Sequence, residues 1–265
     1  MKTTHVNTQA GTRVLTARRA ATALACAATL LSLTACNDGD KADGASDSKA
    51  STAADKPAQA DAKPNGAEKL SAVELRTKGM ETKAAAGSVH EVMSRSDAKS
   101  DLRLSATECV GKVELIGMGG FDVIRKGDDV WGKVDAKFAS WLKKNGSTVP
   151  VDQWMHGSPT DGATKVFASY CHGEQFGKQE KSSLKFTKGA DGEVDGQPVA
   201  TVVAKGTAPG KQATYSIATT GKPYLLKQVA PYSNGTGDQT ITWSDFGPPV
   251  SAKAPSGKVV KAPQI

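Results

Sequence analysis

The sequence is poor in histidine and in the motifs that carry common enzyme chemistry. Of its 265 residues only four are His. Those after position 36, His90, His156 and His172, stand far apart, so no zinc or metalloprotease spacing is present. The nucleophile-elbow and phosphate-loop motifs are absent as well. We therefore expect a protein that is not an enzyme and has no metal and no cofactor.

The chain also lacks an apolar run long enough for an ordinary transmembrane helix. The N-terminal run covers residues 20–35, which is 16 residues, whereas a spanning helix needs about 20. The residues before it include no acid and four bases: Lys2, Arg13, Arg18 and Arg19. A basic start, a short apolar core and small residues at its end predict a signal peptide over residues 1–35. Arg18-Arg19 leaves the export route open between the general and the twin-arginine pathways.

The end of the apolar run predicts a lipid anchor. Leu33-Thr34-Ala35-Cys36 matches the lipobox of bacterial lipoprotein precursors, in which a thiol accepts the diacylglyceryl group and small residues admit the peptidase. A polar segment follows Cys36 at once. The alternative is a plain signal peptide with an incidental cysteine. We expect acylation of Cys36 and a protein held on the extracytoplasmic face of the cell membrane.

Charge gives little support for a nucleic-acid partner. The formal net charge of +7 includes four bases of the predicted signal peptide, and without them it is 30 − 27 = +3. No Lys/Arg cluster with interleaved aromatic residues remains. We expect no nucleic-acid binding, membrane association through Cys36, and a monomer.

Composition divides the exported chain into two parts. Residues 36–68 consist mostly of Ala, Asp, Lys, Ser, Gly and Pro, with no aromatic residue and no apolar periodicity. Such a segment cannot bury enough apolar surface to order itself, so we predict a tether. Residues 69–265 are the length of one ordinary domain.

Two of the four cysteines remain for that domain. Cys26 lies in the signal peptide and Cys36 is the predicted acylation site, which leaves Cys109 and Cys171 in an oxidising compartment. We predict a disulfide between them; the alternative is two unrelated thiols. Closing a loop of roughly 60 residues stabilises a fold by about 4 kcal/mol in the chain-entropy model.

Hydrophobic periodicity then predicts an α+β domain with an antiparallel sheet. An apolar stripe at helical spacing predicts a helix over residues 70–84, closed by Gly87 and interrupted by Gly79. Alternating residues predict hairpin strands around 102–107, 112–115, 121–123 and 130–134. Two helices are expected near 138–142 and 163–170. Five more strands are expected at 184–187, 199–204, 213–219, 224–229 and 240–243.

The order of these elements and several short segments resemble a known family. The segments are 120–127, 130–131, 194–199, 221–225 and 243–250, followed by Ala254-Pro255. In this order they resemble the LolA-like lipoproteins, in the actinobacterial group that includes LppX, LprA, LprF and LprG. The resemblance covers residues 69–265. The Cys109 and Cys171 pair does not map onto the better-known members.

The resemblance implies a curved antiparallel half-barrel packed over helices, with an apolar cavity that takes the acyl chain of a lipid or lipoglycan. The inward-facing residues are the candidate walls: Leu102, Leu104, Val113, Leu115, Phe121, Val123, Phe138 and Trp141. The same residues fit equally well as a closed core. The alternative function is an anchored interaction or regulatory module of the cell envelope with no lipid ligand.

Overall fold

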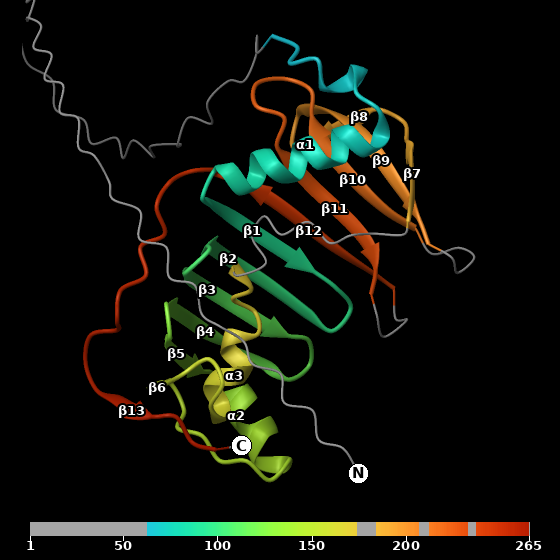
Figure 1. The fold of residues 1–265 in the computed structure, drawn as a ribbon. Coiled ribbons are helices and arrows are strands. Elements are labelled where there is room, and N and C mark those ends of the chain that lie inside the picture. Colours follow the sequence, from blue (N-terminus) through green and yellow to red (C-terminus); the bar gives the residue numbers. More distant parts are fainter. Residues whose placement is uncertain (1–62, 174–183, 207–211, 233–236, 265) are drawn as a thin grey trace, which may run out of the picture. The chain divides into compact units, whose positions relative to one another are not determined.

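The computed structural model describes residues 63–173, 184–206, 212–232 and 237–264. Within these ranges the chain forms one long sheet and a small number of helices (Figure 1). The helices are the 3-10 turn η1 (Ala67–Lys69), α1 (Ala72–Ala85), α2 (Ala136–Lys144) and α3 (Gly162–Ala168). The strands are β1 (Ser88–Ser94), β2 (Ala98–Ser105), β3 (Glu108–Leu115), β4 (Gly119–Lys126), β5 (Asp129–Val134), β6 (Trp154–Gly157), β7 (Lys185–Lys188), β8 (Gly192–Val194), β9 (Gln197–Lys205), β10 (Gln212–Ala218), β11 (Leu225–Pro231), β12 (Asp238–Ser244) and β13 (Val259–Lys261).

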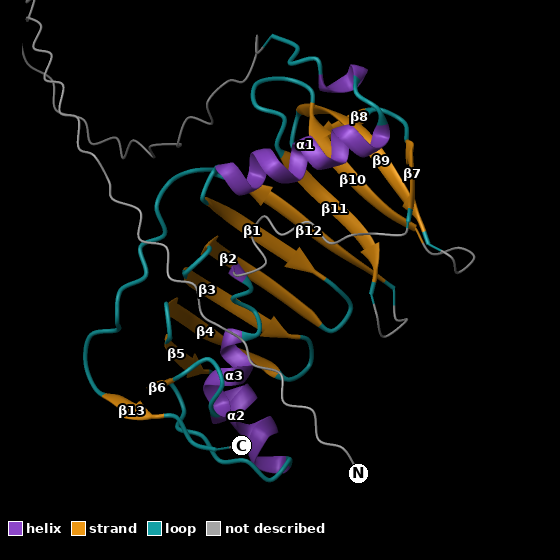
Figure 2. Cartoon of the chain, viewed as in Figure 1, coloured by secondary structure: helices purple, strands orange, loops and turns teal. Residues whose placement is uncertain are grey.

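The strands form one continuous sheet that does not close on itself. Their order is β13-β6-β5-β4-β3-β2-β1-β12-β11-β10-β9-β7, and β8 pairs with β9 beside β7. Every pairing is antiparallel except that of β13 with β6. The predicted α+β class, with a curved antiparallel sheet packed over helices, is confirmed (Figure 2).

The helices cover two separate parts of the sheet. Helix α1 packs on β7, β9, β10, β11 and β1, whereas α2 packs on β4 and α3 packs on β4, β5 and β6 (Figure 1). We call α1 with β7 and β9–β11 the α1 half, and α2 and α3 with β4–β6 the α3 half. Strands β12, β1, β2 and β3 connect the two halves.

Local sequence explains where α1 begins, packs and ends. Ser71 and Glu74 form a capping box, because the Ser71 side chain accepts from the Glu74 N–H and the Glu74 carboxylate accepts from the Ser71 N–H. Gly79 lies where a Cβ would stand 2.7 Å from Ile217 Cγ1, so its missing side chain lets the helix approach the sheet. Gly87 follows the helix at φ 78°, a conformation that favours glycine.

In the α3 half a glycine on a strand likewise lets a helix residue pack closely on the sheet. A Cβ on Gly132 would stand 2.0 Å from Phe167 Cδ2, so the ring of this α3 residue lies directly on β5. Phe121 packs beside it, with ring centroids 4.9 Å apart. The Asp135 carboxylate caps α2 by accepting from Phe138 N–H at 2.6 Å, and it also accepts from Gly120 N–H at 2.7 Å.

The sequence-based elements correspond to the observed ones, but some strands were not predicted. These are β1, β6, β8 and β13, which are short or carry polar residues at inward positions. The ordered contacts also begin before residue 69. Pro64 pairs with Thr220, and the Asn65 side chain donates to the carbonyls of Ala218 and Gly221. The described contacts with the sheet therefore begin at about Pro64.

The C-terminal segment runs from the middle of the sheet to one edge. After β12 the chain passes Val250 and Ala252, both buried, and reaches β13 beside β6 (Figure 1). Of the segment 243–250, which carries part of the family resemblance, only the first two residues belong to β12, and the later part of the tail covers the α3 half.

Candidate functional site

Most of the predicted wall residues lie in one continuous core. Six are buried, with exposed fractions of 4% or less: Leu102, Leu104, Val113, Phe121, Val123 and Phe138. They belong to one hydrophobic cluster that joins the inner faces of both halves, and half-buried Leu115 packs against it. Among the described residues these side chains therefore contact one another as the sheet's core.

Trp141 lies elsewhere. Its side chain is 39% exposed on the outer side of α2, where it stacks on Phe138 with ring centroids 6.0 Å apart. The prediction that Trp141 lines an enclosed cavity is therefore corrected, because the buried side of α2 is formed by Phe138, Ala139 and Leu142.

The predicted disulfide is present and places a segment over the middle of the sheet. Cys109 of β3 is bonded to Cys171, which follows α3. The Cys171 carbonyl accepts from Arg125 Nη1 at 3.0 Å, and a Cβ on Gly173 would stand 1.9 Å from the Ser105 carbonyl oxygen. Residues 169–173, which we call the crossing segment, are thus held against the inner face of β2, β3 and β4.

The end of α1 and the crossing segment contact neighbouring strands on the same inner face of the sheet. Lys83, in the last turn of α1, lies over the Trp243 ring of β12 at 4.0 Å from Nζ to the centroid. His172, in the crossing segment, lies 3.2 Å from Glu91 of β1 through Nε2 and Oε1. We call this boundary between the two halves, over β12, β1 and β2, the seam.

Glu91 is the centre of the seam. Its side chain points inward between Val89 and Met93 and only 3% of the residue is exposed. Its Oε2 accepts from the Trp243 indole N–H at 2.7 Å. Its Oε1 has no aligned hydrogen bond among the described residues, so the contact with His172 is an ion pair.

Electrostatics favour the charged form of this pair. Burial alone would raise the pKa of Glu91, but His172, the Trp243 N–H and the Lys83 ammonium together hold that pKa below its ordinary value. The contact with Glu91 raises the pKa of His172 despite partial burial. Burial lowers the pKa of Lys83, and the Glu91 carboxylate opposes this effect. At the seam these charges therefore lie between Lys83 of α1 and His172 of the crossing segment, beside an apolar core that continues through both halves.

A polar hollow opens at the seam. It has a volume of about 420 Å³, within the range of small-ligand sites. We call it the seam pocket. It is lined by Glu91, Met93, Arg95, Ser100, Ser169, Tyr170, His172, Gln239 and Ile241. Arg95 is held at its rim by Asp97 at 2.5 Å and by the Tyr170 hydroxyl at 3.2 Å. The apolar members, Met93 and Ile241, belong to the floor formed by β1 and β12.

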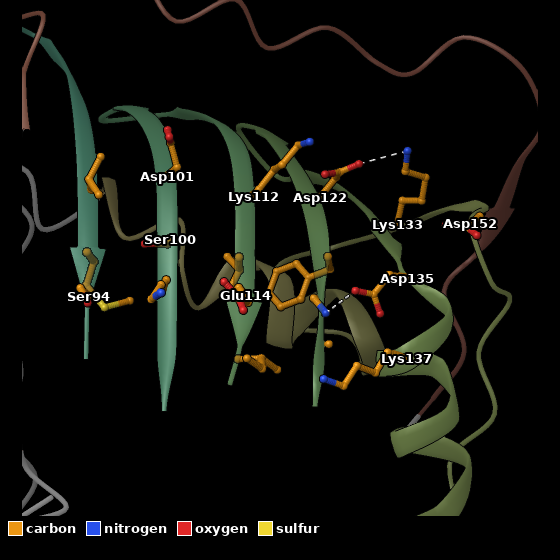
Figure 3. A pocket seen from close by; sticks show the side chains of 18 residues that line it. Ser94, Ser100, Asp101, Lys112, Glu114, Asp122, Lys133, Asp135, Lys137 and Asp152 are labelled. Carbon is orange, nitrogen blue, oxygen red and sulfur yellow. Dashed lines mark hydrogen bonds and ion pairs between the residues drawn. The ribbon is translucent and has the colours of Figure 1, made fainter. Parts of the chain in front are cut away.

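A second hollow lies on the outer face of β1–β5. We call it the outer groove; its volume is about 760 Å³, and its walls are shown in Figure 3. One row of cross-strand partners crosses it: Val92, Asp101, Lys112, Asp122 and Lys133. Lys133 Nζ and Asp122 Oδ2 are 3.0 Å apart. Because charges of both signs alternate along the row, they pair across strands and leave no field of one sign.

The seam is not among the sites that the sequence predicts. His172 enters there only as one of three widely separated histidines, and Glu91 and Lys83 are not candidate site residues. The signal lies in β1, where Val89 and Met93 occupy inward positions on both sides of Glu91. A carboxylate within an alternating apolar face indicates either a buried ion pair or a site.

Neither a metal site nor a membrane-spanning helix is found in the described part of the chain. These ranges hold no group of three or more His, Cys, Asp or Glu side chains suited to a metal ion. Among the same residues, no helix combines the length and the hydropathy that crossing a bilayer requires.

Comparison with known proteins gives similarity in fold. No family model and no curated protein sequence matches the chain. Among solved structures, the Mycobacterium tuberculosis lipoprotein LppX aligns over 68% of this chain and 98% of its own, with 17% identity and a TM-score of 0.46. A LolA superfamily protein from Nitrosomonas europaea aligns over 67% and 93%, with 11% identity and a TM-score of 0.26. The Pseudomonas aeruginosa MucA/MucB complex aligns over 65% and 56%, with 10% identity and a TM-score of 0.30. The family that the sequence resembles is thus among the structures found.

Proposed function

We propose that this protein is an exported lipoprotein, acylated on Cys36, that binds the acyl chain of a lipid between its two halves at the seam. The proposal combines the lipobox, the fold and the polar closure of the seam. Cys36 lies outside the described residues, so anchoring is argued from the sequence alone.

The observation that carries the proposal is the kind of contact that closes the seam. Desolvating a carboxylate and its partners costs several kcal/mol per ion, and apolar side chains of similar volume close a boundary at least as stably. A seam built only for stability would therefore be apolar, like the Gly79 and Gly132 contacts. Separating charged partners costs less free energy than separating apolar ones, because water hydrates the charges again when the boundary opens.

The apolar side chains next to these charged groups would contact an acyl chain once the seam opens. Met93 and Ile241 line the seam pocket, and Leu102 lies on the neighbouring strand next to Ser100 in the inner core. Moving a chain of about 16 carbons out of a membrane requires roughly 12 kcal/mol of replacement apolar contact. Of the two hollows described above, the seam pocket adjoins the inner apolar core, whereas the outer groove is crossed by a row of alternating charges.

Acylation is tested by Cys36→Ala. The expected result is an unprocessed precursor or release of the protein into the medium, because the thiol that accepts the lipid is lost. A correctly cleaved product that remains on the membrane as before would contradict the anchor.

Binding at the seam is tested by a matched pair of substitutions on adjacent residues of β1. Met93→Trp fills the seam pocket from the inner face, whereas Val92→Trp adds the same side chain on the outer face, where Val92 is 39% exposed. We expect Met93→Trp to abolish uptake of a fluorescent fatty-acyl phospholipid and Val92→Trp to leave it unchanged, with melting curves confirming that both fold. Equal uptake by the two variants would contradict the seam as the lipid site.

The second candidate function is an anchored protein-interaction module. The outer groove favours it, because exposed Val92 stands in a row of alternating charges that suits an extended peptide. Exchanging the pair as Asp122→Lys with Lys133→Asp keeps the local ion pair but changes the order of charges. Loss of a cross-linked protein partner in this variant, with lipid uptake intact, would support the second candidate.

A further inference from the structure

Helix α2 presents a stripe of one aromatic and two cationic side chains to solvent. Lys137, Trp141 and Lys144 stand at positions i, i+4 and i+7, so they lie along one side of the helix. The opposite side is buried in the α3 half. We call these three residues the α2 stripe.

The α2 stripe is not explained by the stability of the domain. Trp141 is 39% exposed although one side of its ring packs on Phe138. Lys137 lies in the first turn of the helix, where the helix dipole disfavours a cation. The N-cap Asp135 does not compensate for it specifically, because both of its carboxylate oxygens accept backbone N–H groups.

Residues next to the α2 stripe add further positive charge and further exposed apolar surface. Lys143 adds a third cation in the last turn, and the helix contains no acidic residue. The loop that follows exposes Val151, 49% accessible. Trp141 and Val151 are thus two of the exposed large hydrophobic side chains of the described residues; Trp141 shares its helix with three lysines, and Val151, followed by Asp152, lies in the next loop.

We propose that the α2 stripe docks the domain on an anionic membrane surface. Tryptophan prefers the boundary between water and hydrocarbon, because its ring is apolar and its N–H needs a polar partner. Lysines flanking it pair with anionic headgroups, and their stems cover apolar surface. The surface is a docking site outside the seam, so it goes beyond lipid binding and does not depend on it.

The experiment measures contact between Trp141 and lipid in the acylated full chain reconstituted into vesicles. Vesicles contain brominated phosphatidylglycerol or brominated phosphatidylcholine, and bromine quenches tryptophan emission only at short range. The Trp141 signal is the difference between the parent protein and Trp141→Phe. We expect quenching of this signal in anionic vesicles and much less in neutral ones.

Charge dependence is tested with Lys137→Gln and Lys144→Gln together. Losing two cations near an anionic surface should lower the ratio of docked to undocked protein about 30-fold. The matched control is Lys78→Gln with Lys222→Gln, two exposed lysines next to the C-terminal part of α1, which should leave quenching unchanged.

The outcomes separate the alternatives. Absence of Trp141 quenching in anionic vesicles would overturn the proposal, and so would equal loss of quenching in the two double variants. A protein cross-linked to Trp141 without lipid quenching would assign the α2 stripe to a protein partner and also overturn it. If the chain is not acylated, the mature chain held on nickel-chelating lipid by an N-terminal hexahistidine gives the same readout, so failure of the anchor is distinguished from failure of docking.

Discussion

The α1 half and the α3 half belong to one sheet, but they are fastened in different ways. A disulfide ties the segment that follows α3, through Cys171, to the connecting strand β3, and in the α3 half the Phe167 ring lies directly on Gly132. In the α1 half, a single helix packs on the strands through Leu75 and Gly79, without a covalent link. The α3 half is therefore fastened by a covalent bond as well as by packing, whereas the α1 half depends on packing among the described residues.

The largest expected effect comes from removing the covalent link of the α3 half. Cys171→Ser should lower the free energy of unfolding by about 4 kcal/mol, because the disulfide closes a loop with a sequence separation of 62 residues. Urea denaturation of the oxidised parent and of the variant measures the loss, and reduction of the parent provides the control. An unchanged midpoint would mean that the bond does not fasten this half.

A second pair of variants compares the close approaches of the two halves. Gly132→Ala should cost roughly 3 kcal/mol, because its Cβ would collide with a fully buried aromatic ring that has no space to move. Gly79→Ala should cost about 1–2 kcal/mol, because its Cβ would also press on a fully buried side chain, that of Ile217, but a gain in helix propensity of about 1 kcal/mol offsets part of that cost. The midpoints of urea denaturation measure the stability lost by each variant. Equal losses of stability would contradict the difference between the two halves.

A third, smaller effect concerns the charges of the seam. Glu91→Gln should lower the free energy of unfolding by about 1–2 kcal/mol near pH 6, where Glu91 and His172 are both charged. The figure is modest because the His172 side chain is 39% exposed and water screens the pair.

The pH dependence of that effect follows from the direction of the two pKa shifts. The raised pKa of His172 means that its stabilisation is complete below about 6.5 and is lost as pH rises through the raised value. The lowered pKa of Glu91 means that its stabilisation is present above about 4.5 and is lost as pH falls through the lowered value. Lys83 and Trp243 face the same carboxylate. Glu91→Gln should remove both slopes, whereas His156→Gln, at an exposed pair, should retain them. A parent protein with a flat profile from pH 5 to 9 would contradict the ion pair.

The sequence predicts the parts of the fold that depend on local pattern. Alternation identifies β2–β5, and Gly87 locates the end of α1. The disulfide follows from counting the cysteines that remain after the predicted signal peptide and acylation site are set aside. These features are predictable because each is determined within a few residues or by a single pairing.

The seam is not predictable in this way, because it depends on which strands become neighbours. Glu91 meets Trp243 only because β1 pairs with β12, at a sequence separation of 152 residues. His172 reaches the same carboxylate only because the disulfide holds the crossing segment over β3. The predicted place of Trp141 in a cavity wall was wrong for a related reason. The apolar pattern of a short helix does not show which of its apolar side chains lie at the edge of the buried face.

The central claim is that the two halves separate at the seam to admit an acyl chain. Its most direct test is native mass spectrometry of the mature chain purified from its own envelope in mild detergent. We predict a noncovalent mass in the lipid range that is lost on denaturation, while the covalent anchor remains, and a change in its occupancy in Glu91→Gln. A bare protein mass in both forms, with no uptake of added lipid, would contradict the claim.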